Sequence, residues 1–166
     1  PGRAEEQDGR FGAELGGVRS VMVVVDGETS ELNLLGVTKD SIRTTVSNWL
    51  REEARLPIAS EAEVIESMAG VGIVHISVHA ILDRKVERVA LAVEVELRRR
   101  ALVDCRRYAP LVAAWRAVGM TLVKSKDASA AFGKLLRVKH AELLGNMQEA
   151  KQHEGAARVD ECAVFD

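Results

Sequence analysis

Polar side chains that could take part in chemistry alternate with apolar ones along two predicted neighbouring strands. In chain order they are His75, Ser77, His79, Glu94, Glu96 and Arg98. Alternate residues of a strand share one face of a sheet, so we expect these side chains on one solvent-facing surface. An imidazole beside a carboxylate is suited to general acid–base catalysis, and a pair of imidazoles is suited to binding a metal ion.

Spacing argues against a metal site on this surface. His75 and His79 are four residues apart, which in an extended strand is about 13 Å, whereas metal–nitrogen bonds are about 2 Å long. We therefore predict no bound metal and no cofactor. His75 and Glu94 form the better couple, with Ser77 as the one hydroxyl nearby. A cross-strand polar pair on a solvated sheet explains the same residues, and we prefer that interpretation.

The two strands are predicted to form an antiparallel hairpin because their apolar residues alternate strictly. Those residues are Val74, Ile76, Val78, Ala80 and Leu82, followed by Val89, Leu91, Val93, Val95 and Leu97. A slip by one residue would expose one of the two apolar sets. We expect Leu82 opposite Glu87, or another pair whose residue numbers also sum to an odd number; with Leu82 opposite Glu87, Ile76 lies opposite Val93 and His75 opposite Glu94. The turn is then Asp83 to Val86, or the tighter Arg84-Lys85.

Two other motifs suggest ligand binding only on first inspection. Arg98, Arg99 and Arg100 alternate between the two faces of their strand, and Glu94 and Glu96 share the face of Arg98. Gly70 and Gly72 precede a strand, whereas glycines that hold a phosphate follow a strand and open a helix.

The 25 acidic residues slightly outnumber the 23 Lys and Arg, giving a net charge of -2. We expect no nucleic-acid partner, and any affinity for anions would have to be local.

The composition predicts one domain with an aliphatic core, because 47% of the 166 residues are hydrophobic and only 4% aromatic. We expect a flexible leader at 1–12, a folded domain at 13–152 and a tail at 153–166. The start at Pro1 suggests that a signal or a tag preceded it. Cys105 and Cys162 fit either one disulfide or two thiols. No segment is long and apolar enough to predict a membrane span.

The remaining pattern predicts a short strand at 18–25, a helix at 39–55 capped by Thr38, and a second helix capped by Ser125 or Asp127. Residues 111–123 fit both a helix and a strand that Arg116 interrupts; Pro110 and Gly119 favour the strand. The predicted fold is an α+β two-layer sandwich with the order β-α-β-β-β-α. A mostly antiparallel four-stranded sheet carries two helices on one face.

The segment Gly36-Val37-Thr38-Lys39-Asp40-Ser41-Ile42-Arg43-Thr44, followed by Trp49-Leu50-Arg51, opens an amphipathic helix. Together with Trp115 and Gly119 before a terminal helix, it resembles a loose family of exported, mostly uncharacterised bacterial α+β domains. The resemblance spans roughly 18–151. It implies a location in the cell envelope, with export or the periplasm favoured over the cytoplasm, and a non-catalytic module. It carries over no site residues.

Two hypotheses about function follow. The first is a non-catalytic interaction or structural module of a bacterial envelope assembly, which binds a protein partner through the polar sheet face. The expected binding residues are His75, His79, Glu94, Glu96 and Arg98. The alternative is a small enzyme or ligand-binding domain that uses His75 and Glu94 beneath the loop at 28–36.

Overall fold

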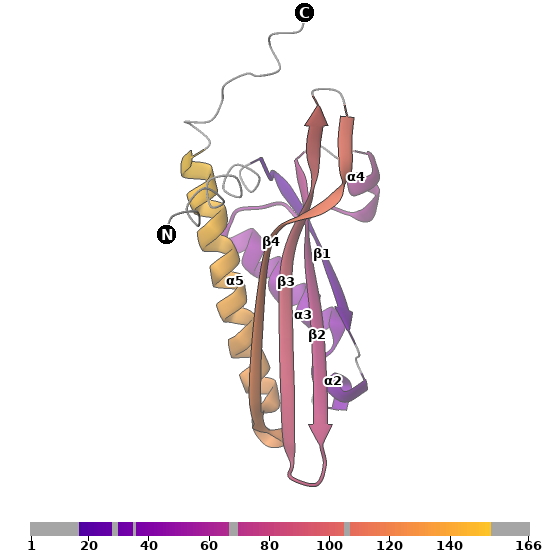
Figure 1. The fold of residues 1–166 in the computed structure, drawn as a ribbon, viewed down its shortest axis with the longest axis vertical. Helices are drawn as coiled ribbons and strands as arrows, with labels where there is room; N and C mark the ends of the chain where they lie inside the picture. The colour runs from indigo at the N-terminus through magenta and orange to yellow at the C-terminus, as the bar shows by residue number, and fades with distance from the viewer. Residues whose placement is uncertain (1–16, 28–29, 35, 67–69, 105–106, 154–166) are drawn as a thin grey trace, which may run out of the picture.

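The protein has an α+β fold built on one four-stranded sheet (Figure 1). The computed structural model describes residues 17–27, 30–34, 36–66, 70–104 and 107–153. The strands lie in the order of the chain: β1 (Ser20–Gly27), β2 (Val71–Asp83), β3 (Arg88–Asp104) and β4 (Arg107–Lys124). β1 runs parallel to β2, and the other neighbours are antiparallel. The predicted mostly antiparallel sheet is confirmed.

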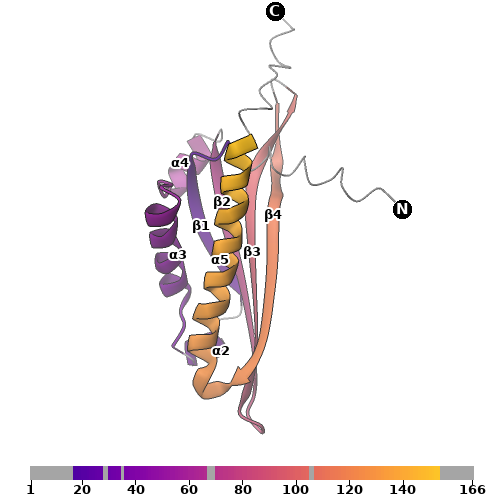
Figure 2. The same ribbon diagram turned by 90° about the vertical axis from the view of Figure 1, so that its left-hand side faces the viewer.

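The long helices form a second layer on one face of this sheet (Figure 2). They are α3 (Lys39–Glu53), which packs near β1, and α5 (Ala128–His153), which packs against β3 and β4. The structure also contains two short helices that we did not predict, α2 (Ser30–Leu34) and α4 (Glu61–Glu66). α2 lies within the predicted 28–36 loop, and its Leu32 is buried in the core. Such short helices carry too little periodicity to stand out in the sequence.

Thr38 is the N-cap of α3, as predicted. Its hydroxyl accepts a hydrogen bond from the Ser41 backbone N–H, and the Ser41 hydroxyl accepts one from the Thr38 N–H, both at 3.1 Å. This reciprocal arrangement satisfies two backbone donors at the helix start. The helix ends at Glu53, two residues before the predicted end, and Arg55 follows in a left-handed conformation with a φ of 57°.

Of the two predicted caps of the C-terminal helix, Asp127 directly precedes the helix and Ser125 does not. Residues Ser125–Asp127 form a 3-10 turn, η1, and α5 follows directly from Ala128. The Ser125 hydroxyl oxygen is buried and has no hydrogen-bond partner within the described residues, so Ser125 does not cap the helix. The turn is instead held by the Ser125 N–H, which donates to the Glu87 carbonyl oxygen at 2.9 Å.

The predicted hairpin is confirmed in its faces but wrong in its register. Ile76 lies opposite Val95, and His75 lies opposite Glu96, a shift of two residues from the prediction. A shift of two keeps every apolar side chain on the same face, so alternation alone could not detect it. The turn sets the register: it spans residues 84–87, and its last residue, Glu87, adopts a φ of 50°.

The segment from Arg107 to Lys124 is a strand, as favoured, but three of its apolar side chains, at 118, 120 and 122, point away from the helices. Val118, Met120 and Leu122 are exposed, whereas the alternate residues face α5. Gly119 explains why this face of β4 is turned toward α5. A Cβ atom there would lie 2.6 Å from Leu135 Cδ1, so α5 can approach β4 only because this position lacks a side chain.

Several predictions fall on residues outside the described ranges. These are the leader at 1–12, most of the tail at 153–166, and both cysteines, Cys105 and Cys162. None of the described helices is long and apolar enough to cross a membrane.

Candidate functional site

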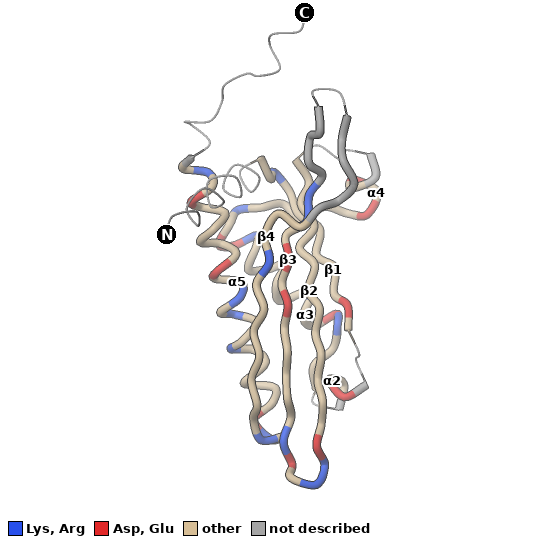
Figure 3. The backbone as a smooth tube through the Cα atoms, viewed as in Figure 1, with Lys and Arg blue, Asp and Glu red and all other residues tan. Residues whose placement is uncertain are grey.

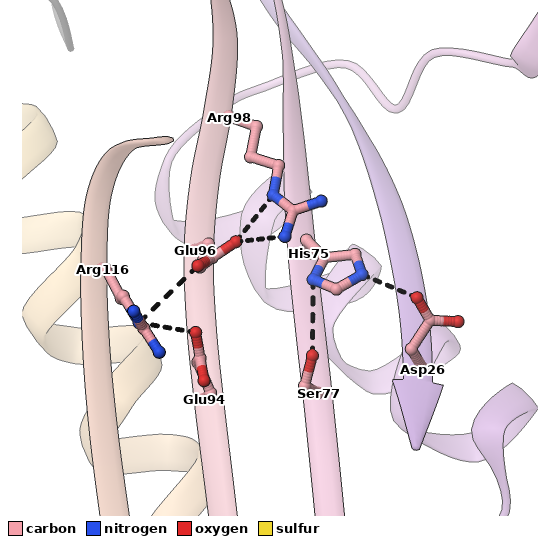
Figure 4. A network of polar contacts seen from close by, with 7 residues as sticks. All are labelled: Asp26, His75, Ser77, Glu94, Glu96, Arg98 and Arg116. Atoms are coloured by element: carbon pink, nitrogen blue, oxygen red, sulfur yellow. Dashed lines mark hydrogen bonds and ion pairs between the residues drawn. The ribbon is translucent and has the colours of Figure 1, made fainter. Parts of the chain in front are cut away.

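The open face of the sheet, opposite the helices, carries a cluster of polar side chains from all four strands (Figure 4). We call it the polar cluster; its members are Asp26, His75, Ser77, Glu94, Glu96, Arg98 and Arg116. The pleat brings them together because each occupies a position that points away from the helical layer. β1 contributes Asp26 because its parallel register places Asp26 beside Ser77.

His75 is held between a carboxylate and a hydroxyl. His75 Nε2 lies 2.7 Å from Asp26 Oδ2, and His75 Nδ1 lies 3.5 Å from Ser77 Oγ. The carboxylate favours the tautomer in which Nε2–H donates to Asp26, which leaves Nδ1 as an acceptor for the Ser77 hydroxyl. The hydrogen bond from His75 holds the pKa of Asp26 below its usual range.

The other half of the polar cluster is a set of ion pairs centred on Glu96, the most buried carboxylate of the group. Arg98 Nε donates to Glu96 Oε2 at 2.6 Å. Arg116 Nε lies 2.6 Å from Glu94 Oε1 and 3.6 Å from Glu96 Oε1. Burial raises the pKa of Glu96, but its hydrogen bond and charge interactions with Arg98 outweigh burial and hold the pKa below the usual range. The carboxylate is therefore ionised and paired at neutral pH.

The line Asp26–His75–Ser77 contains the three residue types of a serine hydrolase, with Ser77 as nucleophile and His75 as base. Its surroundings do not favour that reaction. Ser77 lies in the middle of an interior strand, where neighbours on both sides take up the backbone N–H groups that could stabilise an oxyanion. Its cross-strand neighbour is Glu94, whose carboxylate would repel developing negative charge.

Next to the polar cluster the open face becomes apolar. Two successive cross-strand rows consist of Ile81, Ala90 and Leu122, and of His79, Ala92 and Met120. We call them the apolar rows. Ile81 is 71% exposed and Met120 is 77% exposed. A shallow cleft of about 500 Å³ runs along these rows.

The structure brings together four of the five predicted binding residues and separates the fifth. His75, Glu94, Glu96 and Arg98 belong to the polar cluster, whereas His79 is exposed among the apolar rows. The predicted couple of His75 with Glu94 is wrong. His75 faces Glu96 across the strands and bonds to Asp26, while Glu94 pairs with Arg116.

Sequence reasoning missed Asp26 and Arg116. Asp26 lies just beyond the predicted strand at 18–25, and its approach to His75 depends on a parallel register that no local pattern encodes. Arg116 was interpreted as an interruption of its strand. Its spacing from Val118 and Met120 could have shown that all three share a face.

Within the described residues, no three or more His, Cys, Asp or Glu side chains are placed so that they could hold one metal ion. The polar cluster combines three carboxylates with two guanidinium groups and one imidazole. Arg98 and Arg116 pair with Glu96 and Glu94, and His75 contacts Asp26, so each carboxylate already has a partner within the chain.

Comparisons with known proteins give only distant likenesses. No family model matches the chain, and no curated protein matches it. A PelC variant from Paraburkholderia phytofirmans, solved as a dodecamer, is 18% identical over 78% of this chain and 88% of its own, with a TM-score of 0.46. The hypothetical protein CT253 from Chlamydia trachomatis is 12% identical over 78% of this chain and 98% of its own, with a TM-score of 0.47. Neither likeness carries an inference about ligands or partners.

Proposed function

We propose that this protein is a non-catalytic interaction module that binds a protein partner through the open face of its sheet. The observation that carries the proposal is the exposed apolar surface. Ile81, Met120 and Leu122 are each at least 60% exposed and lie on adjacent rows of one flat face. Contiguous exposed apolar side chains bordered by polar residues mark protein interaction sites.

The polar cluster indicates which partner would fit. Its charges are paired within this chain, so a strongly charged partner would gain little from them and would have to break existing ion pairs. An aliphatic patch with a neutral polar rim would bury the apolar rows without that cost. We therefore expect a partner surface of that composition.

Site-specific photo-crosslinking in the cells that make this protein tests the proposal. A photoreactive residue at Met120 should crosslink one predominant protein. The same residue at Val138, which is 52% exposed on α5 in the helical layer, should not. Met120→Asp should then weaken binding of the purified partner at least about tenfold, because a charge would enter the apolar contact. Equal crosslinking at both positions, or none at Met120, would contradict the proposal.

An envelope location forms part of the same proposal, and its support is the resemblance of the Gly36–Thr44 segment and of Trp49, Trp115 and Gly119 to exported domains. Fractionation of cells that express the full natural gene should place the protein with the envelope. Recovery only with the cytoplasm would reject this part while leaving the docking surface standing.

The second candidate is a small enzyme, and the line Asp26–His75–Ser77 is the observation that favours it. An active serine nucleophile reacts covalently with a fluorophosphonate probe. Labelling that disappears in Ser77→Ala and in His75→Ala would support this candidate. If the interaction module is correct, neither the natural protein nor these variants should be labelled.

A further inference from the structure

The end of the molecule formed by the β2–β3 turn and the β4–η1 junction is rich in cations (Figure 3). We call it the basic end; its cations are Arg84, Lys85, Arg88, Lys124 and Lys126. Acidic residues there are Asp83, Glu87 and Asp127. None of these five cations forms an ion pair with any described residue, whereas Arg98 and Arg116 are fully engaged in the polar cluster.

Two of these cations are placed directly against each other. Arg88 and Lys124 are cross-strand partners of β3 and β4 and point to the same open face. Like charges in this position repel and destabilise a sheet. Asp83 lies opposite Arg88 on its other side, but its Oδ1 accepts a hydrogen bond from the Lys85 N–H at 2.9 Å and forms no ion pair. Among the described residues, neither Arg88 nor Lys124 is therefore held in an ion pair.

Beside this pair lies a cleft of about 350 Å³. Its lining consists of Val86, Glu87, Arg88, Lys124, Ser125 and Lys126. Three cations thus face one carboxylate. Ser125 also borders the cleft, but its hydroxyl oxygen is buried, so the cations are the groups that a ligand in the cleft would meet.

We propose that this cleft binds a phosphate group. A guanidinium can donate two parallel hydrogen bonds to phosphate oxygens, and the two ammonium groups add point charges that attract the anion. A bound phosphate would lie between Arg88 and Lys124 and relieve their repulsion. The group could belong to a phospholipid headgroup or to a soluble phosphate, which offer the same oxygens. Arg88 and Lys124 form the open-face row next to Ala90 and Leu122, but the two clefts share no lining residue, so phosphate binding can be tested without the proposed protein partner.

Titration of the isotope-labelled protein with inorganic phosphate tests the site, with backbone amide shifts as the readout. Chloride should hold the ionic strength constant, because surface charges are screened by salt. We expect saturable shifts at residues 86–88 and 124–127, with a dissociation constant on the order of 1 mM. Lys124→Ser should weaken binding at least about fivefold, because it removes a charged donor from the cleft.

Lys85→Ser is the matched control, since it removes the same charge from the same end of the molecule but not from the cleft lining. It should change phosphate affinity by less than about twofold. An equal loss in both variants would overturn the proposal in favour of a general positive potential, and an absence of saturable shifts would overturn it outright.

Vesicle flotation identifies the source of the phosphate. If binding to phosphatidylglycerol vesicles but not to phosphatidylcholine vesicles accompanies phosphate binding, and Lys124→Ser abolishes it, the ligand is an anionic lipid headgroup. Phosphate binding without vesicle binding supports a soluble phosphate as the ligand.

Discussion

His140, in the helical layer, is 2% exposed and neither of its ring nitrogens has a hydrogen-bond partner among the described residues. His75, on the open face, lies between Asp26 at 2.7 Å and Ser77 at 3.5 Å. The two histidines thus sit on opposite sides of one sheet under opposite conditions. Burial on the helical side disfavours the charged form of His140, whereas the open face supplies partners for charged groups.

The surroundings of His140 explain its state. Burial between α5 and α3 lowers the pKa of His140 to about 4; the nearby Glu53 carboxylate acts to raise it, and the Arg137 guanidinium lowers it further. Glu53 Oε2 lies 3.8 Å from His140 Nε2, and the imidazole ring packs against Trp49 at 5.1 Å between centroids. Arg137 donates to Glu53 Oε1 at 2.6 Å and covers the Trp49 ring.

The strongest test of the contrast between the faces uses two adjacent residues of β3. Val93 is fully buried on the helical side, so Val93→Asp places an unpaired charge in the core and should cost about 3 kcal/mol or more of unfolding free energy. Glu94→Ala removes a partly exposed side chain from the open face and should cost less than about 1 kcal/mol. Chemical denaturation measures both, and equal losses would contradict the assignment of the two faces.

A pH titration of stability sharpens the comparison between the histidines. The pKa of His140 is about 4 in the folded protein, below its ordinary value of 6.5, so the unfolded chain binds the proton more readily. The part of the unfolding free energy that arises from this difference in pKa is fully present above pH 6.5. It is lost as the pH falls toward 4. We expect a loss of roughly 2 kcal/mol, allowing for partial screening by water.

His140→Phe is the control for this titration, because it keeps an aromatic ring against Trp49 and removes the titratable group. Its stability should be nearly constant between pH 6.5 and 4.5. Asp26 and Glu96 also have lowered pKa values, so the folded protein loses unfolding free energy when these two carboxylates are protonated at lower pH. An unchanged slope in His140→Phe would show that another group titrates.

Within the open face, Arg98 should matter more than the other cations. Arg98→Ala deprives the nearly buried Glu96 of its 2.6 Å hydrogen bond and leaves Arg116 at 3.6 Å as the remaining cation. We expect a loss of about 1 to 2 kcal/mol and a rise in the pKa of Glu96. Arg43→Ala, which breaks an exposed pair with Asp40 on α3, should cost less than about 0.5 kcal/mol. Similar losses would mean that Glu96 does not depend on Arg98.

The parts of this fold that could be predicted from the sequence are those encoded locally. Alternation predicted which hairpin residues are buried, and Thr38 marked the start of α3. The register of the hairpin depended on the left-handed Glu87 in the turn, which alternation does not report.

The polar cluster could not be predicted in full because it depends on contacts between elements that are distant in the sequence. Asp26 reaches His75 only through the parallel pairing of β1 with β2, and the outward face of β4 follows from the contact of Gly119 with α5. Both features depend on contacts between residues that are far apart in the sequence. The alternation of apolar residues at 118, 120 and 122 therefore correctly predicts a strand, but it does not predict which face of the sheet these residues occupy.

The smallest expected effect tests whether the open face contributes to function without stabilising the fold. Asp26 is 62% exposed at its side chain, so water screens its contact with His75. His75→Ala should therefore lower the unfolding free energy by less than about 1 kcal/mol, measured by chemical denaturation at neutral pH. If the polar cluster borders a docking surface, the same variant should still weaken capture of the partner crosslinked at Met120. A loss of stability above about 2 kcal/mol would instead indicate that the cluster is a cooperative structural network, and unchanged partner binding would confine docking to the apolar rows.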